Sequence, residues 1–156
     1  MPDTSLQYRR AGAGDLDAIV ALLADDVLGS TREDPSVPAS ACYVRAFEAI
    51  DRDPNQLLAV AVRQGVVVGC LQLSFIPGLS RRGLWRGQIE SVRVAAGERG
   101  AGTGRAMFEW AIGQCRARGC GLVQLTTDKA RGDARRFYES LGFTATHEGM
   151  KQELAA

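Results

Sequence analysis

The stretch of sequence that decides the fold is Val92–Phe108, which reads V-R-V-A-A-G-E-R-G-A-G-T-G-R-A-M-F. It begins as the end of a short strand and runs into a helix, with small residues where the helix should start. Backbone N–H groups at such a turn can approach a bound group closely. They also lie at the positive end of the helix dipole, which favours a phosphate or pyrophosphate. The turn residues are Arg99, Gly100, Ala101, Gly102, Thr103 and Gly104, and Arg105 adds a second positive charge.

Two other phosphate-binding loops have a similar order of strand, glycines and helix. A triphosphate-binding loop ends in G-K-[ST], whereas this chain has Gly104-Arg105-Ala106. A dinucleotide fingerprint reads G-x-G-x-x-G and needs an acidic residue after a second strand, whereas the order here is R-x-x-G-x-G. A glycine-rich turn that binds nothing is the remaining alternative for an isolated G-x-G.

The second half of the chain favours a binding loop. About thirty residues after R-x-x-G-x-G comes F-Y-E-S-L-G-F, which is Phe137–Phe143. Together with the strand Gln88–Val94, these motifs resemble the GNAT superfamily of N-acetyltransferases, and the resemblance extends from Tyr8 to about Leu154. It implies acetyl-coenzyme A (acetyl-CoA) as cofactor, with its pyrophosphate in the glycine loop. The residues expected at the cofactor are Val92, Arg93, Val94, Arg99, Gly100, Ala101, Gly102, Thr103, Gly104, Arg105 and Arg131.

Arg131 is a departure from the family pattern. Family members often carry asparagine three residues before the alanine that is Ala134 here. Arg131 belongs to a basic cluster that either meets coenzyme phosphates or coats a solvated helix face.

Composition agrees with one domain over residues 1–156, since a chain of this length can bury a core. The formal net charge is +1, which predicts neither a nucleic-acid partner nor a membrane partner. No signal segment is apparent at the N-terminus, and the four cysteines lack C-x-x-C spacing. We therefore expect a cytoplasmic protein with reduced thiols and no metal site.

The expected fold class is α/β, with a mixed, mostly antiparallel sheet of about seven strands flanked by about four helices. Apolar alternation and helical spacing, read together with the resemblance, give these elements. Strands are expected at 6–10, 56–63, 66–75, 88–94, 122–126, 143–147 and 150–154, and helices after Asp15, around Tyr43–Ile50, at 102–118 and from about Asp133. Residues 77–87 are expected to form a mobile loop.

The alternation of apolar residues slips by one in the strand 88–94, between Ile89 and Val92. A β-bulge near Glu90 or Ser91 would produce this slip, as would burial of both faces of the strand. The resemblance implies a bend here that opens a V-shaped gap toward the strand 122–126, where the pantetheine arm of the cofactor would pair with the backbone.

Acyl transfer to an amine needs a base and an acid. Glu90, on the bulged strand, is the candidate base. Alternatively, Glu90 is only a surface or ion-paired carboxylate, and a chain of water molecules removes the proton. Tyr138 matches the tyrosine of the family motif F-Y-x-x-x-G-F and is the candidate acid for the leaving thiolate. Its alternative role is core packing beside Phe137. A backbone N–H near Val92 would stabilise the oxyanion.

The acceptor is expected to be a small amine that carries an anionic group. Arginines around Trp85, namely Arg81, Arg82 and Arg86, suit an oxyanion. Glu33 and Asp34, in a polar loop that borders the acceptor site in the family, would instead suit a polycation. The alternatives for the whole protein are acetylation of a protein or peptide and a non-catalytic coenzyme A-binding regulatory domain. A homodimer is compatible with each of them.

Overall fold

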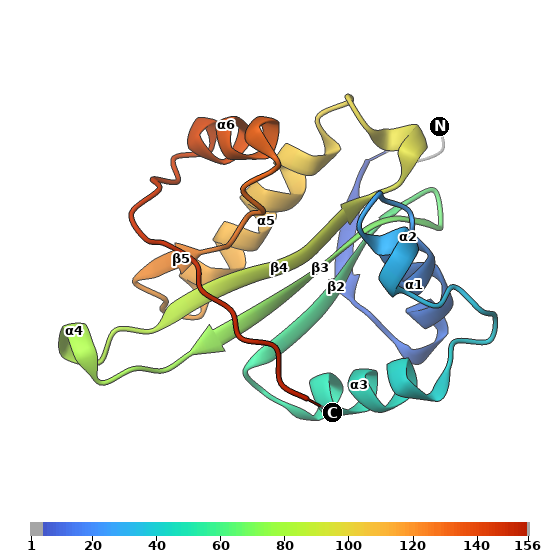
Figure 1. Ribbon diagram of the computed structural model, residues 1–156, viewed down its shortest axis with the longest axis horizontal. Helices are drawn as coiled ribbons and strands as arrows, with labels where there is room; N and C mark the ends of the chain where they lie inside the picture. The colour runs from blue at the N-terminus through green and yellow to red at the C-terminus, as the bar shows by residue number, and fades with distance from the viewer. Residues whose placement is uncertain (1–4, 156) are drawn as a thin grey trace.

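The computed structural model describes residues 5–155, and its strands form one sheet in the order β1-β2-β3-β4-β5 (Figure 1). The first four strands pair antiparallel in sequence order, and β5 pairs parallel with β4. Their bounds are β1 Gln7–Arg10, β2 Gln56–Arg63, β3 Val66–Ile76, β4 Arg86–Val94 and β5 Leu122–Gln124. The predicted mixed, mostly antiparallel sheet is confirmed.

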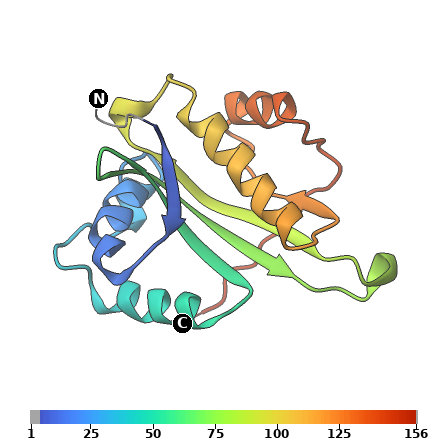
Figure 2. The same ribbon diagram turned by 180° about the vertical axis from the view of Figure 1, so that it is seen from behind.

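Helices cover both faces of this sheet. Helix α5 lies across one face, which Figure 2 shows from behind, and α1 and α3 lie on the other. The helices are α1 Leu16–Ala24, α2 Gly29–Arg32, α3 Ala41–Arg52, α4 Ser80–Gly83, α5 Thr103–Ala117 and α6 Gly132–Ser140, with 3₁₀ turns η1 Ala13–Asp15 and η2 Ala96–Glu98. Among the described residues, no helix combines the length and apolar composition needed to cross a bilayer.

Alternation along the strands divides the core in two. Leu71, Leu73 and Ile89 pack with Met107 and Phe108 of α5 on one face. The other face carries a second cluster beneath α1 and α3, formed by Ala11, Ile19, Phe47, Leu58, Val60, Val62 and Cys70. Because successive side chains of a strand point to opposite faces, β2 and β3 supply both clusters.

The hairpin between β3 and β4 extends further than expected. β3 continues to Ile76 and β4 begins at Arg86, so the predicted loop 77–87 shrinks to the tip of a projecting hairpin (Figure 1). At this tip the short turn α4 has left-handed backbone at Arg81, Arg82 and Gly83, with φ angles of 55°, 60° and 77°.

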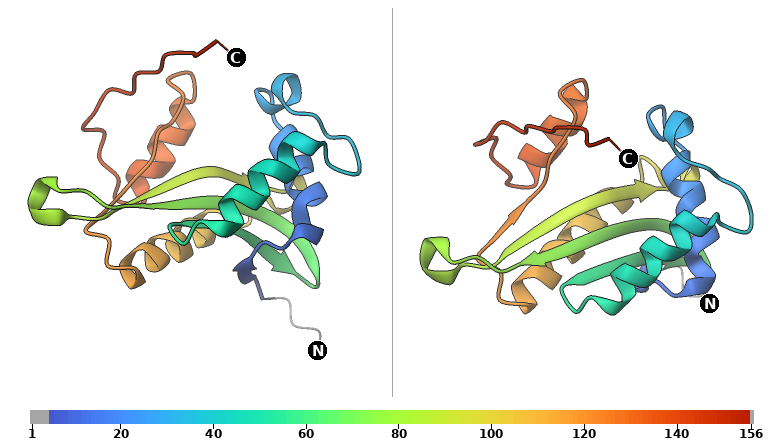
Figure 3. Two further views of the ribbon diagram at one scale, coloured as in Figure 1. Left: turned by 90° about the horizontal axis from the view of Figure 1, so that it is seen from below. Right: turned by 60° about the horizontal axis from the view of Figure 1, so that its bottom comes forward.

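The expectation of about seven strands is wrong for residues 5–155, which form a sheet of five. Residues 143–147 and 150–154 form no strand and follow an extended path after α6, which we call the tail (residues 143–155). Figure 3 shows the tail crossing the sheet on the side opposite α5 without joining it. The predicted strands contain few apolar residues, and the side chains of Met150 and Leu154 are 93% and 84% exposed. The tail therefore lacks the buried face that stabilises a strand within one chain.

Candidate active site

A β-bulge in β4 forms the centre of the candidate site. Cys70 of β3 pairs with Arg93, and Gln72 pairs with Glu90, so Leu71 alone faces two residues of β4. Those residues are Ser91 and Val92, and Ser91 has a left-handed φ of 55°. The bulge predicted from the slip in alternation is confirmed, and it frees part of the β4 backbone from the ladder.

Beyond the bulge, β4 loses its partner on the other side. The parallel pairing with β5 covers only Arg86, Gly87 and Gln88 of β4. From Ile89 to Val94, no described strand pairs with this edge of β4. β4 therefore lacks a strand partner on this side from Ile89 onward, as the expected gap between β4 and β5 requires.

The end of β4 leads directly into the glycine loop. Gly100 and Gly102 have φ angles of 81° and 83°, and α5 begins at Thr103. A Cβ added at either glycine would meet no atom within 4 Å. The loop borders a cavity of about 370 Å³ lined by Val94, Glu98, Arg99, Gly100, Gly102, Gly104, Arg105 and Phe137. Open space beside the unpaired N–H groups of a helix start fits a phosphate group.

The two arginines of this loop, Arg99 and Arg105, contact different neighbours. Arg99 donates to the Val94 carbonyl and pairs with Asp25, and Arg105 donates to Ser140 on α6. Arg99 and Arg105 are both exposed, so their guanidinium groups can turn toward a ligand. The hydroxyl of the buried Thr103 donates to Glu98 and supports the turn.

Tyr138 lies on α6 within a group of aromatic rings. Phe108 and Phe137 meet it edge to face, with centroid distances of 5.4 and 5.6 Å, and Phe143 lies 6.3 Å away. Burial raises the pKa of Tyr138, and the nearby charges of Arg131 and Arg93 partly oppose that rise. The phenol is therefore protonated at neutral pH and available as a proton donor.

Arg93 and Arg131 converge on Asp26, which follows α1. Nε of Arg93 lies 3.1 Å from the Asp26 carboxylate, and a terminal nitrogen of Arg131 lies 3.5 Å from it. The Gly29 N–H, followed by these two charges, lowers the pKa of Asp26. The carboxylate thus joins α1 to the start of α6 across the end of β4. Sequence reasoning missed Asp26, because no motif or spacing links it to either arginine.

Glu90 is exposed beside the bulge. Its carboxylate accepts a 3.0 Å hydrogen bond from the Gln88 amide, two residues earlier on the same strand. Cys70 lies beneath the bulge, and burial raises the pKa of its thiol to about 12. Glu90 is therefore accessible to a ligand, whereas Cys70 stays protonated and unreactive.

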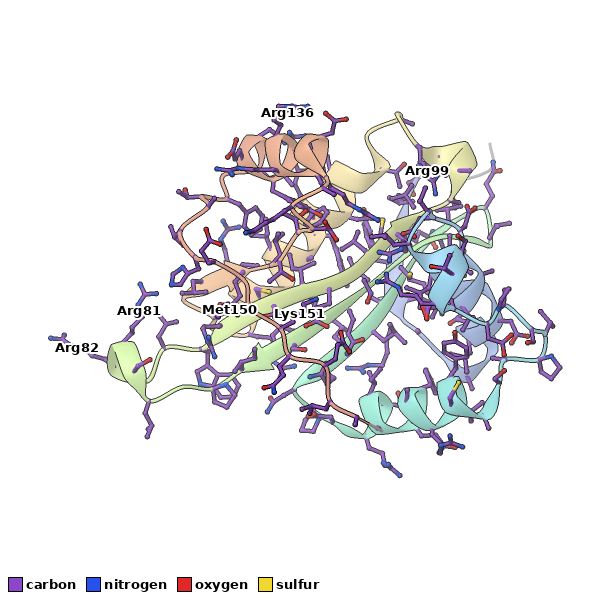
Figure 4. All side chains as sticks on the ribbon, in the orientation of Figure 1. Arg81, Arg82, Arg99, Arg136, Met150 and Lys151 are labelled. Carbon is purple, nitrogen blue, oxygen red and sulfur yellow. The ribbon has the colours of Figure 1, made fainter. Side chains whose placement is uncertain are left out.

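The remaining predicted residues do not gather at the bulge. The exposed Arg81 lies at the tip of the β3–β4 hairpin, and in Figure 4 it points away from the sheet, as does Arg82. Trp85 is half-buried against the core cluster on the α5 side. Glu33 is the residue after α2 and accepts a 3.4 Å hydrogen bond from the hydroxyl of Tyr43, which lines a cavity of about 160 Å³ beneath α1 and α3 that extends to Ser91.

Comparison with known proteins agrees with this geometry. Residues 24–143 match the family described as Acetyltransferase (GNAT) family. The aminoalkylphosphonate N-acetyltransferase of Salmonella typhimurium is 29% identical over 141 residues, covering 90% of this chain and 86% of that protein. The glucosamine 6-phosphate N-acetyltransferase of Trypanosoma brucei brucei is 36% identical over 90 residues, covering 58% of this chain and 59% of that protein.

A solved structure from Bacillus halodurans C-125, described as a transcriptional regulator, has the same fold. It superposes with a TM-score of 0.93 at 49% identity, covering 96% of this chain and all of that chain.

Proposed function

The chain belongs to the GNAT acetyltransferase family, and from this premise we propose that it moves an acetyl group from acetyl-CoA directly to the primary amine of a small molecule. Family membership makes it an acetyl-CoA-dependent acetyltransferase. The observation that carries the proposal of transfer at the bulge is the continuity of the bulge, the unpaired edge of β4 and the glycine loop. These features form one continuous path from the proposed phosphate site at the glycine loop to Glu90.

The chain's own residues supply the binding path. When bound, acetyl-CoA provides an activated thioester. We assign its pyrophosphate to the N–H groups at the start of α5, with charge from Arg99 and Arg105. The free edge of β4, which includes Val92 and Val94, binds the pantetheine arm by strand-like hydrogen bonds. Arg131 borders this path from α6.

Glu90 is assigned the role of base. An ammonium group has no lone pair, so the amine must lose a proton before it attacks. Glu90 is exposed at the bulge, and its hydrogen bond from Gln88 holds its carboxylate in place. The carboxylate accepts the amine proton directly or through one water.

Tyr138 is assigned the role of acid. Its raised pKa keeps the phenol protonated, so it can donate that proton to the departing sulfur. The proximity of Arg93 and Arg131, residues of the cofactor path, supports a position of Tyr138 beside the gap. Direct transfer is favoured over an acetylated cysteine, because the thiol beneath the bulge, that of Cys70, is buried and protonated.

The names of the relatives support a small acceptor. Two of the curated relatives are named for acetylating an aminoalkylphosphonate and glucosamine 6-phosphate, and both of these amines carry an anionic group. Three arginines suggested such an acceptor. Arg81 and Arg82 lie at the tip of the β3–β4 hairpin, whereas Arg86 is the first residue of β4. An anion would therefore bind near Arg86.

A regulatory role is the second candidate function, because the similar structure from Bacillus halodurans is described as a transcriptional regulator. A protein that only senses acetyl-CoA would bind it without consuming it. The presence of both Glu90 and Tyr138 favours catalysis over sensing.

We also infer a homodimer formed through the tail. Within residues 5–155, no backbone hydrogen bond involves the tail beyond Phe143. The outer edge of β5 is also open in the single chain. An extended segment and an open strand edge suit exchange between two copies.

Replacing Glu90 by Gln tests the assigned chemistry. The amide keeps the size of the side chain but cannot accept the proton, so turnover should fall by about 10² to 10⁴. Affinity for acetyl-CoA, measured by calorimetry, should stay unchanged. Glu48→Gln, on the exposed side of α3, is the matched control and should keep the wild-type rate. Equal rates for the two variants would assign proton removal to water instead of Glu90.

A further inference from the structure

The face of the sheet beside Glu90 carries two adjacent rows of polar side chains. Strand register places Gln56 opposite Ser74, Ser74 opposite Gln88, and Gln88 opposite Gln124. Directly paired residues point to the same face, so one straight polar row crosses β2, β3, β4 and β5. The next row pairs Gln72 with Glu90. We call these residues the polar rows: Gln56, Ser74, Gln88 and Gln124, with Gln72 and Glu90.

The polar rows lie on the face opposite α5. Leu58 pairs with Gln72 and belongs to the core cluster beneath α1 and α3, which identifies the face. In Figures 1 and 3 the helices α1, α2 and α3 lie toward one end of this face, and the tail crosses it. The glutamines and Ser74 are half-buried, and Glu90 is exposed. A polar strip therefore adjoins the point where β4 and β5 separate.

Hydrogen bonds connect these side chains into two sets. Gln72 and Ser74 both donate to the Gln56 amide oxygen, each at 2.9 Å. Gln124 donates to Gln88 at 2.7 Å, and Gln88 donates to Glu90 at 3.0 Å. A glutamine amide has two N–H donors and two acceptor sites, so these bonds leave capacity for a ligand. The second set ends at the proposed base.

Arg86 adds a cation at one end. It lies two residues before Gln88, and pairing with Ile76 and Leu122 puts its side chain on the same face. It is half-buried, and among residues 5–155 its side chain makes no hydrogen bond or ion pair. The α carbons of Arg86 and Glu90 are about 13 Å apart along an extended strand. The face therefore carries an unpaired cation, then amides, then a carboxylate.

Resting on the proposed function, we propose that the acceptor is a hydroxylated amine with an anionic group, of the amino sugar phosphate class, bound along the polar rows. Its ammonium meets Glu90, its hydroxyl groups exchange hydrogen bonds with Gln88 and Gln124, and its phosphate pairs with Arg86. An alkyl amine without hydroxyl groups would desolvate these amides without giving them partners. A polyamine would bring a second positive charge to Arg86.

The first test compares acceptors with the full-length protein. Thiol release from acetyl-CoA is measured with glucosamine 6-phosphate, glucosamine, 2-aminoethylphosphonate and spermidine. The expected kcat/KM is highest for glucosamine 6-phosphate, by at least about tenfold over each of the others. A higher value for any of the other three would overturn the assignment of the acceptor class. Binding of acetyl-CoA with no acetylation of any amine would instead overturn the proposed function.

The second test uses variants of the polar face. Arg86→Gln should raise KM for glucosamine 6-phosphate at least about tenfold and leave KM for glucosamine unchanged. Gln124→Leu should raise KM for both sugars more than it does for 2-aminoethylphosphonate. Arg116→Gln, on the exposed side of α5, is the control and should change neither value. Equal KM values for Arg86→Gln and Arg116→Gln would show that Arg86 does not bind the phosphate.

Discussion

Tyr138 shows how the surroundings of one residue prepare its chemistry. The ring lies among Phe108, Phe137 and Phe143, and burial raises the pKa of its hydroxyl. A raised pKa keeps a phenol neutral to higher pH, so deprotonation of Tyr138 should limit the rate only at a pH above that at which a free tyrosine ionises. The motif F-Y-E-S-L-G-F predicted that Tyr138 is the acid. The surrounding aromatic rings and the nearby arginine charges could not be predicted from the sequence, because the fold brings them together.

Tyr138→Phe removes the acid and keeps the ring packing. Turnover should fall by about 10² to 10⁴, with affinity for acetyl-CoA nearly unchanged. Tyr8→Phe is the control, because Tyr8 stacks on Trp110 at a centroid distance of 4.9 Å and has no assigned role in transfer. The steady-state rates of the two variants show whether the Tyr138 hydroxyl takes part in transfer. A wild-type rate for Tyr138→Phe would reduce Tyr138 to a packing residue.

At the scale of elements, local patterns predicted most of the sheet. The alternation of apolar residues predicted the observed bounds of β2. It also predicted the bounds of β3, except that β3 ends one residue later than expected. The slip between Ile89 and Val92 gave the bulge, because a bulge shifts the face to which later side chains point. The polar rows were missed, since they become visible only when strand register aligns Gln56, Ser74, Gln88 and Gln124.

The start of α5 allows a direct test of the cofactor cradle. Gly104 has ordinary helical backbone, and an added Cβ would meet only a Val94 methyl group, at 3.9 Å. Gly104→Leu should therefore fold normally, but its side chain should enter the cavity beside the loop and weaken coenzyme A binding at least tenfold, a change of about 1.4 kcal/mol. Calorimetry measures the affinity for coenzyme A, and thermal unfolding measures the stability of the fold.

Gly113→Leu is the matched control, because Gly113 lies later in the same helix and an added Cβ there meets nothing within 4 Å. Both substitutions remove a helical glycine, which favours the helix by up to about 1 kcal/mol. Equal coenzyme A affinity in the two variants would contradict the assignment of the loop.

At the scale of the whole molecule, the tail is where prediction from sequence failed. The stretches 143–147 and 150–154 were expected to extend the sheet, yet beyond Phe143 the described side chains are exposed and the backbone makes no hydrogen bond within the single chain. Local sequence could not show this, because a strand needs a partner edge and a buried face as well as suitable residues. A second copy of the chain can supply both.

Truncation after Phe143 tests the inferred dimer. Light scattering coupled to gel filtration should report a dimer for the full-length chain and a monomer for the truncated chain. The single chain buries few of the removed residues, so truncation should leave the monomer folded, as judged by circular dichroism. A monomeric full-length protein would refute exchange of the tail.

The most direct measurement of acetyl transfer follows both products of one reaction. Full-length protein is mixed with acetyl-CoA and glucosamine 6-phosphate, and free thiol and acetylated amine are quantified together by absorbance and mass spectrometry. We predict that each thiol released is matched by one N-acetylated amine over many turnovers, with no acetyl group left on the protein. Binding of acetyl-CoA without turnover of this or any other small amine, or acetylation of protein lysines alone, would contradict the assignment of a small-molecule N-acetyltransferase.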